Sequence, residues 1–446
     1  MPLLLTLLAL FLAACQVVIT TPVPTLTPTV TATLSPSATP TPTASATASA
    51  TATATPSPAA LGDTALHLRT FDELWSLVED VYLYPDYNGA DWNAVRARYR
   101  PLVEAGQSDE AFYNLMWDVM AELGDGHSNF QDPQTVLEEE ASLAGNNDYV
   151  GIGIYVLAVP DKQRAVILFP FPNSPAEEAG LRAHDSILTV DGQQILDENG
   201  DLRDIVRGPD GSTVTLLVQS PGGEPREMSL VRRRITGSVP VESRVILHNG
   251  KRIGYIFLPT FADDTVPDKV IGALRALAPL DGLILDDRQN EGGADTNLIA
   301  TIELFTNGTL GYFVSREDER PLAVGAPSDG AQDVAGSQTV PLVVLIGADT
   351  VSYGEVFAGI LQDQGRATII GETTLGNVET MWGYDLPDGS RVWIARESFR
   401  PARHPEMDWE HDGIVPDISA PARWEEITPD ADPGVQAALD YLTGKP

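Results

Sequence analysis

The sequence has little cysteine, lysine or positive charge. Its only cysteine is Cys15, so disulfide bonds and thiolate chemistry are excluded for the chain beyond it. Lysine and arginine together number 28, against 63 aspartates and glutamates, which gives a formal charge of −35 and a pI near 4.3. Nucleic acids and anionic lipid surfaces require clustered cations, so neither is an expected partner. We interpret the acidity as an adaptation for solubility outside the cell.

The sequence also lacks a histidine spacing that indicates a metal. Its six histidines include no H-E-x-x-H pattern or comparable pair. We therefore expect no metal and no cofactor.

Charge is absent from the first sixty residues as well. An apolar run over residues 3–14 ends in Leu-Ala-Ala-Cys15, which is typical of a bacterial lipoprotein signal, although no Lys or Arg precedes it. We interpret residues 1–15 as the signal peptide, with Cys15 as the site of lipid attachment. Residues 16–61 are rich in Thr, Pro and Ala and predict a disordered tether. The expected location is the bacterial cell envelope, exported and lipid-anchored, on the periplasmic or the extracellular face.

Residues 62–140 are expected to form a helical segment. Apolar residues recur at helical spacing, for example at Leu74 and Val78, and again from Phe112 to Leu123. Glycines at 124 and 126 end the second helix and leave His127 on a loop. His127 is a candidate general base, and the alternative is a solvated loop histidine.

Residues 146–235 predict a small β-rich module. Short apolar strands alternate with turns, and the segment SPAEEAGL at 174–181 predicts a short helix with Pro at its start and Gly at its end. This segment and HDSILTVDG at 184–192 resemble a PDZ domain. The resemblance implies capture of a peptide C-terminus, whose carboxylate would meet the backbone N–H groups of Gly151, Ile152 and Gly153. The alternative is a module that serves only as a spacer.

Residues 236–430 alternate short apolar strands with helical stretches, which predicts an α/β domain, followed by a C-terminal tail at 431–446. The apolar run 342–346 predicts a buried parallel strand, and Ser352 stands on the turn into the next helix. Ser352 is either an N-cap or a nucleophile at the edge of a sheet. Gly292 and Gly293 follow another strand, at 283–285, and could offer N–H groups to an oxyanion.

The order of these parts over residues 65–420 resembles the C-terminal processing (tail-specific) serine peptidases and their tricorn-like relatives. The most specific segment is QDQGRATIIGETTLGN at 362–377. The resemblance implies a ClpP/crotonase-like catalytic domain with Ser352 as the nucleophile. It also implies an oxyanion hole formed by the N–H of Tyr353 together with Gly292 or Gly293.

One position departs from the processing peptidases. They place a general-base lysine directly after the motif's last glycine, and here that residue is Asn377, which cannot accept the proton of a hydroxyl. The only lysines are Lys162, Lys251, Lys269 and Lys445.

The tricorn-like branch uses a histidine base instead, supported through a serine by a distant glutamate. Matched to that branch, His127 is the base and Glu410 the glutamate. Gly126 stands where the branch has its serine, so Ser128 or Asp125 is left as the orienting group. His404 and His411 are the competing bases.

The sequence thus predicts a serine endopeptidase of Ser-His type that acts on proteins or peptides with free C-termini. Catalysis would pass through an acyl-enzyme on Ser352. The alternative is a catalytically inactive peptide-binding homologue of the same fold, in which the family lysine has been replaced by Asn377. Self-association into a homo-oligomer is left open.

Overall fold

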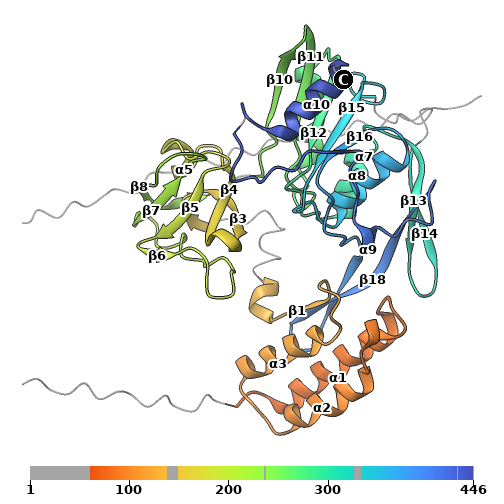
Figure 1. Ribbon diagram of the computed structural model, residues 1–446. Helices are drawn as coiled ribbons and strands as arrows, with labels where there is room; N and C mark the ends of the chain where they lie inside the picture. Colours follow the sequence, from red (N-terminus) through yellow and green to blue (C-terminus); the bar gives the residue numbers. More distant parts are fainter. Residues whose placement is uncertain (1–60, 138–148, 236–237, 326–332, 429, 445–446) are drawn as a thin grey trace, which may run out of the picture. The chain divides into compact units, whose positions relative to one another are not determined.

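We describe a computed structural model of the chain (Figure 1). The structure describes residues 61–137, 149–235, 238–325, 333–428 and 430–444. The predicted signal peptide, Cys15 and all but the last residue of the predicted tether lie outside these ranges. Within them, no helix combines the length and the apolar character needed to cross a bilayer.

Three helices form the N-terminal part: α1 (Thr64–Val81), α2 (Trp92–Glu104) and α3 (Asp109–Ala121). Each begins at a capping side chain that accepts backbone N–H bonds, namely Asp63, Asp91 and Ser108. A short 3₁₀ turn, η1 (Tyr87–Gly89), joins the first two helices. The apolar face predicted for α1 is the one that packs, because Leu74 and Val78 are fully buried.

The segment 62–140 also contains a short strand that the sequence did not indicate, β1 (Asn129–Gln131), after the end of the third helix. It pairs antiparallel with the long strand β18 (Arg391–Pro401), and Phe130 is buried in one cluster with Val392 and Ile394. The partner strand comes from more than 250 residues later in the chain. A local periodicity cannot reveal such a partner, so tertiary pairing overrides the local pattern here.

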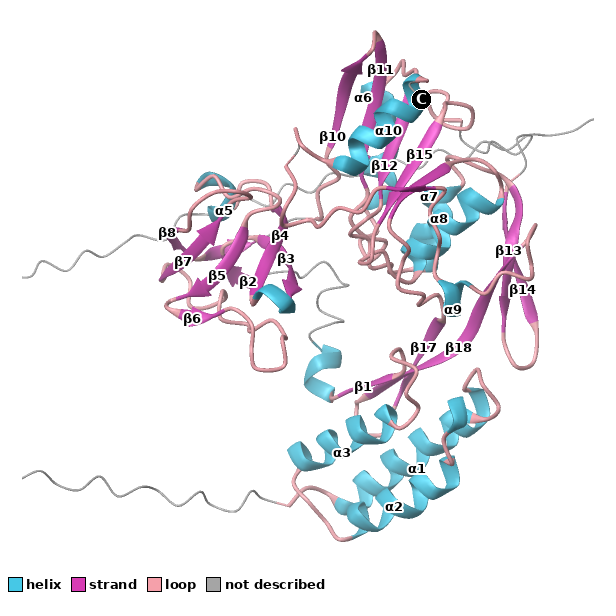
Figure 2. Cartoon of the chain, in the orientation of Figure 1, coloured by secondary structure: helices cyan, strands magenta, loops and turns pink. Residues whose placement is uncertain are grey.

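The β-rich module has a five-stranded path, β3-β4-β5-β7-β8, with β6 on β5 and a separate pair β2-β9 (Figure 2). Buried and less buried residues alternate along β7, as expected for a strand with one face on a core. Its strands are β2 (Tyr149–Gly151), β3 (Ile154–Val159), β4 (Arg164–Pro170), β5 (Ser186–Val190), β6 (Gln193–Gln194), β7 (Thr213–Gln219), β8 (Arg226–Val231) and β9 (Arg233–Ile235). The helical turns are η2 (Pro160–Lys162) and α5 (Pro175–Glu178).

The α/β domain is built on a six-stranded sheet of order β10-β11-β12-β15-β16-β19, parallel except for β10. Alternate residues of β12 and β15 belong to two different apolar clusters, so both faces of the sheet are covered. The strands are β10 (Ser243–His248), β11 (Lys251–Phe257), β12 (Gly282–Asp286), β15 (Leu342–Ile346), β16 (Thr368–Gly371) and β19 (Ile418–Ser419). The helices are α6 (Val266–Leu277), α7 (Asp295–Ile302), α8 (Tyr353–Asp363) and α10 (Pro433–Thr443).

A second sheet connects the helical part to the α/β domain. Its strands are β1, β13 (Gly308–Val314), β14 (Glu319–Val324), β17 (Thr380–Asp385) and β18. One half of β18 packs with the N-terminal helices, while Phe399 near its other end packs with α8 and with Trp409 of α9 (Trp409–Asp412). This sheet brings the loop after α3 to the α/β domain. The three-part fold class predicted from the sequence is confirmed.

Candidate active site

Ser352 lies on the turn between β15 and α8, as predicted. The strand is apolar and buried along its whole length, and the helix begins at Tyr353. The backbone of Ser352 has φ 56° and ψ −125°, whereas an ordinary N-cap residue has β-region angles. With this ψ, Ser352 lies outside the left-handed helical region as well, and a conformation in such a sparsely populated region costs about 1–3 kcal/mol. Ser352 and Glu355 form a capping box at the start of α8, but the backbone of Ser352 differs from that of a plain helix cap.

Gly292 approaches Ser352 more closely than any larger residue could. A Cβ at this position would lie 2.8 Å from Ser352 Cβ and 2.9 Å from the backbone nitrogen of Tyr353, and φ is +87°. Thr260 Oγ1 and the N–H of Phe261 donate to the Gly292 carbonyl, which fixes its orientation. The Gly292 N–H donates to Asn290 Oδ1 over 3.0 Å.

The oxyanion donors predicted from the sequence therefore differ in availability. The Gly292 N–H already has a partner, which leaves the N–H groups of Gly293 and Tyr353. Tyr353 opens α8, where N–H groups have no partner within the helix. An anion beside Ser352 would meet these donors and the positive end of the helix dipole.

Glu355 ties the serine turn to the loop that carries Asn377. Its carboxylate accepts from the backbone N–H groups of Ser352 at 3.1 Å, Gly376 at 2.8 Å and Asn377 at 2.9 Å. The side chain is fully buried. Burial raises the pKa of Glu355, against the opposing effect of a hydrogen bond with the Thr374 side chain and of these backbone bonds. The main chain at Asn377, the residue expected to replace the family lysine, is thus tied to the turn that carries Ser352.

His127 is buried and paired with Glu410. Its Nε2 lies 3.2 Å from Glu410 Oε1, and 8% of the residue is exposed. Burial by itself would lower the pKa of His127. The hydrogen bond to Glu410 and the charges of Glu379 and Glu410 outweigh it, and the pKa of His127 is raised. The structure thus brings these two predicted residues together directly.

The two residues proposed to orient His127 shape its loop instead. Asp125 Oδ1 accepts from the backbone N–H groups of His127 and Ser128, and Asp125 Oδ2 accepts from the Ser128 hydroxyl. Ser128 Oγ also accepts from the N–H of Ala395 in β18. The ring of His127 is held by Glu410 without an intervening serine.

Two residues of this cluster were missed by the sequence reasoning. Glu379 is 4% exposed, its Oε2 lies 3.8 Å from His127 Nε2, and its Oε1 accepts from the Tyr84 hydroxyl. Burial raises the pKa of Glu379 to about 7. The only signal was its place two residues after Asn377, at the end of the motif loop. Nothing in the local sequence marks Tyr84.

Ser352 and His127 are not joined in this structure. Among the described residues, the hydrogen bonds of the His127 ring do not include one to the Ser352 hydroxyl. The competing bases have partners of their own: His404 Nδ1 lies 2.8 Å from Asp363, and His411 Nδ1 lies 2.7 Å from Asp412 on an exposed surface.

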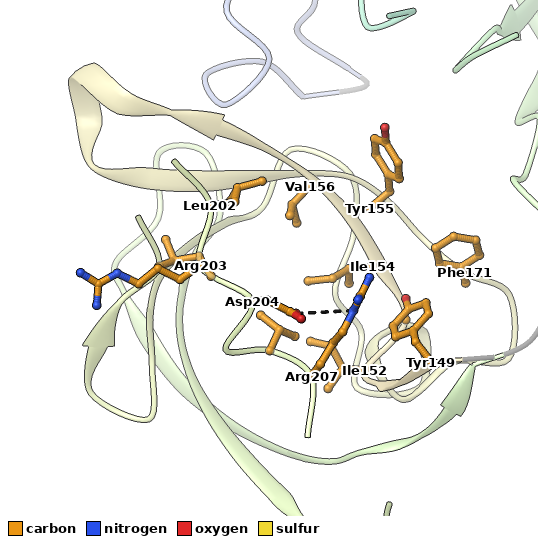
Figure 3. A pocket seen from close by; sticks show the side chains of 13 residues that line it. Tyr149, Ile152, Ile154, Tyr155, Val156, Phe171, Leu202, Arg203, Asp204 and Arg207 are labelled. Atoms are coloured by element: carbon orange, nitrogen blue, oxygen red, sulfur yellow. Dashed lines mark ion pairs between the residues drawn. The ribbon is translucent and has the colours of Figure 1, made fainter. Parts of the chain in front are cut away.

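The β-rich module contains a groove of about 420 Å³ (Figure 3). Its lining includes Tyr149, Ile154 and Arg207, with two of the three predicted carboxylate-binding residues, Ile152 and Gly153. The third, Gly151, pairs with Arg233 between β2 and β9. Arg207 stacks over the ring of Tyr149 at 4.9 Å and lies 3.5 Å from Asp204. The groove combines an apolar floor with a guanidinium, a combination that suits a peptide end.

The fold, with a serine on a strand-to-helix turn and an accessory β-rich module, is that of a serine peptidase with a PDZ domain, and sequence comparisons agree. The model of peptidase family S41 matches residues 252–420, the tricorn protease C1 domain matches 67–121, and a PDZ domain matches 171–220.

Similarity to known proteases extends along most of the chain. It is 32% identical over 400 residues to the carboxyl-terminal-processing protease of Synechocystis sp., covering 87% of this chain and 89% of that protein. The protease of that name from Picosynechococcus sp. is 32% identical over 387 residues, with coverages of 83% and 88%. A solved structure, the photosystem II D1 C-terminal processing protease, superposes with a TM-score of 0.56 at 26% identity, covering 82% of this chain and 99% of that one. The chain belongs to peptidase family S41, the family of the carboxyl-terminal-processing proteases, and the predicted family is confirmed.

Proposed function

We propose that this protease works by a Ser-His mechanism with Ser352, His127 and Glu410. The Ser352 hydroxyl attacks a peptide carbonyl carbon as its proton passes to His127. The N–H groups of Tyr353 and Gly293 stabilise the resulting oxyanion. The protonated His127 then gives its proton to the leaving amine. Water hydrolyses the acyl-enzyme in the same way: His127 accepts the proton of the water as it attacks and then gives it to the Ser352 oxygen.

The observation that carries this proposal is the contact of 3.2 Å between His127 Nε2 and Glu410 Oε1. A base that titrates near neutral pH needs an acceptor to hold its ring, and this pair supplies it in a chain with Asn377 at the lysine position. The ring must come within hydrogen-bond reach of Ser352 during the reaction. Catalytic hydrogen bonds are often absent before substrate binds, so their absence here does not oppose the assignment.

The groove of the PDZ-like module would bind the C-terminal end of the substrate. An extended peptide can pair with a strand edge while its carboxylate meets backbone N–H groups at Ile152 and Gly153. Arg203 and Arg207 also line the groove, where Arg207 is paired with Asp204. We infer that substrates are proteins or peptides with accessible C-termini and an apolar terminal side chain.

A second candidate function is peptide binding without catalysis. Two observations favour it: Asn377 at the lysine position, and a His127 ring that shares no hydrogen bond with Ser352 in the described residues. This candidate keeps the groove and assigns no chemistry to Ser352.

We also propose that Cys15 carries a lipid that anchors the protein in the bacterial cell envelope. The apolar run that ends at this residue supports the proposal. Metabolic labelling with a fatty acid should mark the wild-type protein and not Cys15→Ala. Equal labelling of both would refute the anchor.

Labelling of the purified protein with a fluorophosphonate probe separates the two functions. We expect wild type to react, Ser352→Ala and His127→Ala to lose the reaction, and the control His411→Ala to keep it. Asn377→Lys tests in the same experiment whether a lysine base at this position supports the reaction. Labelling of Asn377→Lys alone would mean that catalysis was lost with the lysine. Absence of labelling in wild type and in every variant would favour the binding function.

A further inference from the structure

His127 shares its surroundings with two carboxylates. Its Nε2 lies 3.2 Å from Glu410 Oε1 and 3.8 Å from Glu379 Oε2, and the three atoms all lie within 4.8 Å of one another. The histidine comes from the loop after α3, Glu379 from the residue before β17 and Glu410 from α9. The spacing of histidines in the sequence could not indicate this cluster, because its members lie up to 283 residues apart.

Each carboxylate is held by the oxygen that does not face the histidine. The Tyr84 hydroxyl donates to Glu379 Oε1, and the N–H of Val378 donates to Glu410 Oε2 over 2.7 Å. These bonds leave Glu379 Oε2 and Glu410 Oε1 directed at the imidazole. Outer contacts of this kind fix the orientation of ligands in metal sites.

Glu379 Oε2 has no hydrogen-bond donor among the residues that the structure describes, although the residue is only 4% exposed. His127 Nε2, at 3.8 Å, is too distant for a hydrogen bond. A buried carboxylate oxygen without a partner is costly. A cation between the three side chains would satisfy it.

The spacing suits a small divalent ion. Zn²⁺ binds nitrogen and oxygen ligands at about 2.0–2.2 Å, so two ligands of a tetrahedral ion lie about 3.4 Å apart. The two separations from His127 Nε2, 3.2 and 3.8 Å, lie on either side of that value, and the two carboxylate oxygens lie within 4.8 Å of each other. An imidazole ligand favours a transition metal over Mg²⁺ or Ca²⁺, which prefer oxygen ligands alone.

We propose that His127, Glu379 and Glu410 bind a divalent transition-metal ion, with Zn²⁺ as the first candidate, and that the bound ion switches the peptidase off. An imidazole with a metal on Nε2 keeps a proton on Nδ1. It therefore has no lone pair left to accept the proton of Ser352. The inhibition rests on the proposed function, whereas the metal site itself does not.

Binding is measured first, on the full-length protein with Cys15→Ser so that the single thiol cannot bind the ion. Zn²⁺ is titrated against a chromophoric chelator. We expect one tight equivalent in this parent and in the control His411→Ala, and at least tenfold weaker binding in Glu379→Gln and in His127→Ala. Tyr84→Phe, which removes only an outer contact, should weaken binding about 10- to 100-fold. Zn²⁺ should also raise the Tm of the parent and not that of Glu379→Gln.

Equal Zn²⁺ affinity in the parent and Glu379→Gln would overturn the site, as would absence of binding by the parent. Circular dichroism checks that each variant is folded, and Tyr84→Phe supplies the comparison should Glu379→Gln fail to fold.

Inhibition is measured by fluorophosphonate labelling with stoichiometric Zn²⁺ and after removal of the ion with EDTA. In the parent, labelling should be lost with Zn²⁺ and return with EDTA. In Glu379→Gln, labelling with Zn²⁺ should be close to labelling with EDTA. Labelling that persists with Zn²⁺ bound would overturn the switch. Binding as expected in a parent that never reacts, even with EDTA, would leave the metal site standing and refute the proposed peptidase mechanism.

Discussion

Nε2 of His127 and Oε1 of Glu410 lie 3.2 Å apart although 283 residues separate them in the chain. The histidine belongs to the helical part and the glutamate to the α/β domain, and β18 packs against both. Formation of the pair therefore depends on the whole fold rather than on one loop. In the mechanism that we propose, this pair takes the place of the lysine base.

Glu410→Gln should change the pH dependence of the reaction. The Glu410 carboxylate favours the imidazolium form and thereby contributes to the raised pKa of His127. A base must be unprotonated, so activity in wild type should fall at acidic pH with a midpoint above about 6.5. In Glu410→Gln the midpoint of this acidic fall in activity should move to lower pH. The maximal rate should drop about 10²- to 10⁴-fold, because the ring loses its acceptor. Labelling rates across pH measure both effects.

Asp412→Asn is the matched control for that change, since Asp412 lies on the same helix and its partner is the exposed His411. It should leave the midpoint of the acidic fall in activity unchanged. An unchanged midpoint in Glu410→Gln would contradict the role of Glu410.

Gly292→Ala should abolish reaction at Ser352 while leaving a folded protein. The added Cβ would lie 2.8 Å from Ser352 Cβ, in the space that an oxyanion needs. Loss of one oxyanion interaction costs about 10²- to 10³-fold in rate, and we expect at least that. Gly308→Ala is the control, because Gly308 has a similar φ of +96° with no atom within 4 Å of its added Cβ. Equal activity of the two variants would show that backbone strain, rather than contact with Ser352, governs the result.

Glu355→Gln should destabilise the protein by about 2–4 kcal/mol. The glutamine retains one acceptor oxygen but presents an NH₂ group to backbone N–H donors that the carboxylate now binds. Urea denaturation followed by circular dichroism measures the free energy of unfolding. Glu372→Gln, at an exposed position nearby, should stay within about 0.5 kcal/mol of wild type. Equal stability of the two variants would mean that the three bonds contribute little.

Asp432→Asn should be among the most destabilising conservative changes. Asp432 accepts two bonds from the buried Arg288, at 3.0 and 2.6 Å, and also caps the N-terminus of α10. Removing one charge of a buried pair costs about 3–5 kcal/mol, because the other charge is left without compensation. Asp430→Asn, at an exposed position, is the control. A loss below about 1 kcal/mol would show that Asp286, the other partner of Arg288, compensates the charge alone.

The sequence predicted the parts of the fold that local patterns determine. The continuous apolar run at 342–346 is the buried strand β15, and the serine after it stands on a strand-to-helix turn. The apolar spacing of Leu74 and Val78 identified the packed face of α1. These features depend on neighbours a few residues away, which a sequence displays directly.

Long-range contacts are where the sequence was insufficient. The strand β1 exists because β18 offers it a partner, and Glu379 is buried because Tyr84 and His127 surround it. The direct contact of Glu410 with the histidine, without a serine between them, likewise depends on distances that no spacing encodes. Reasoning from a family motif reached His127 and Glu410, but the motif carries no position for Glu379.

The carboxylate of Glu355 has a consequence for how such an enzyme can change. It binds the main-chain N–H groups of Ser352, Gly376 and Asn377 and the side chain of Thr374, so none of these contacts depends on the side chain that residue 377 carries. Under the proposed mechanism, residue 377 could therefore change between lysine and asparagine while the main chain that holds Ser352 stays in place.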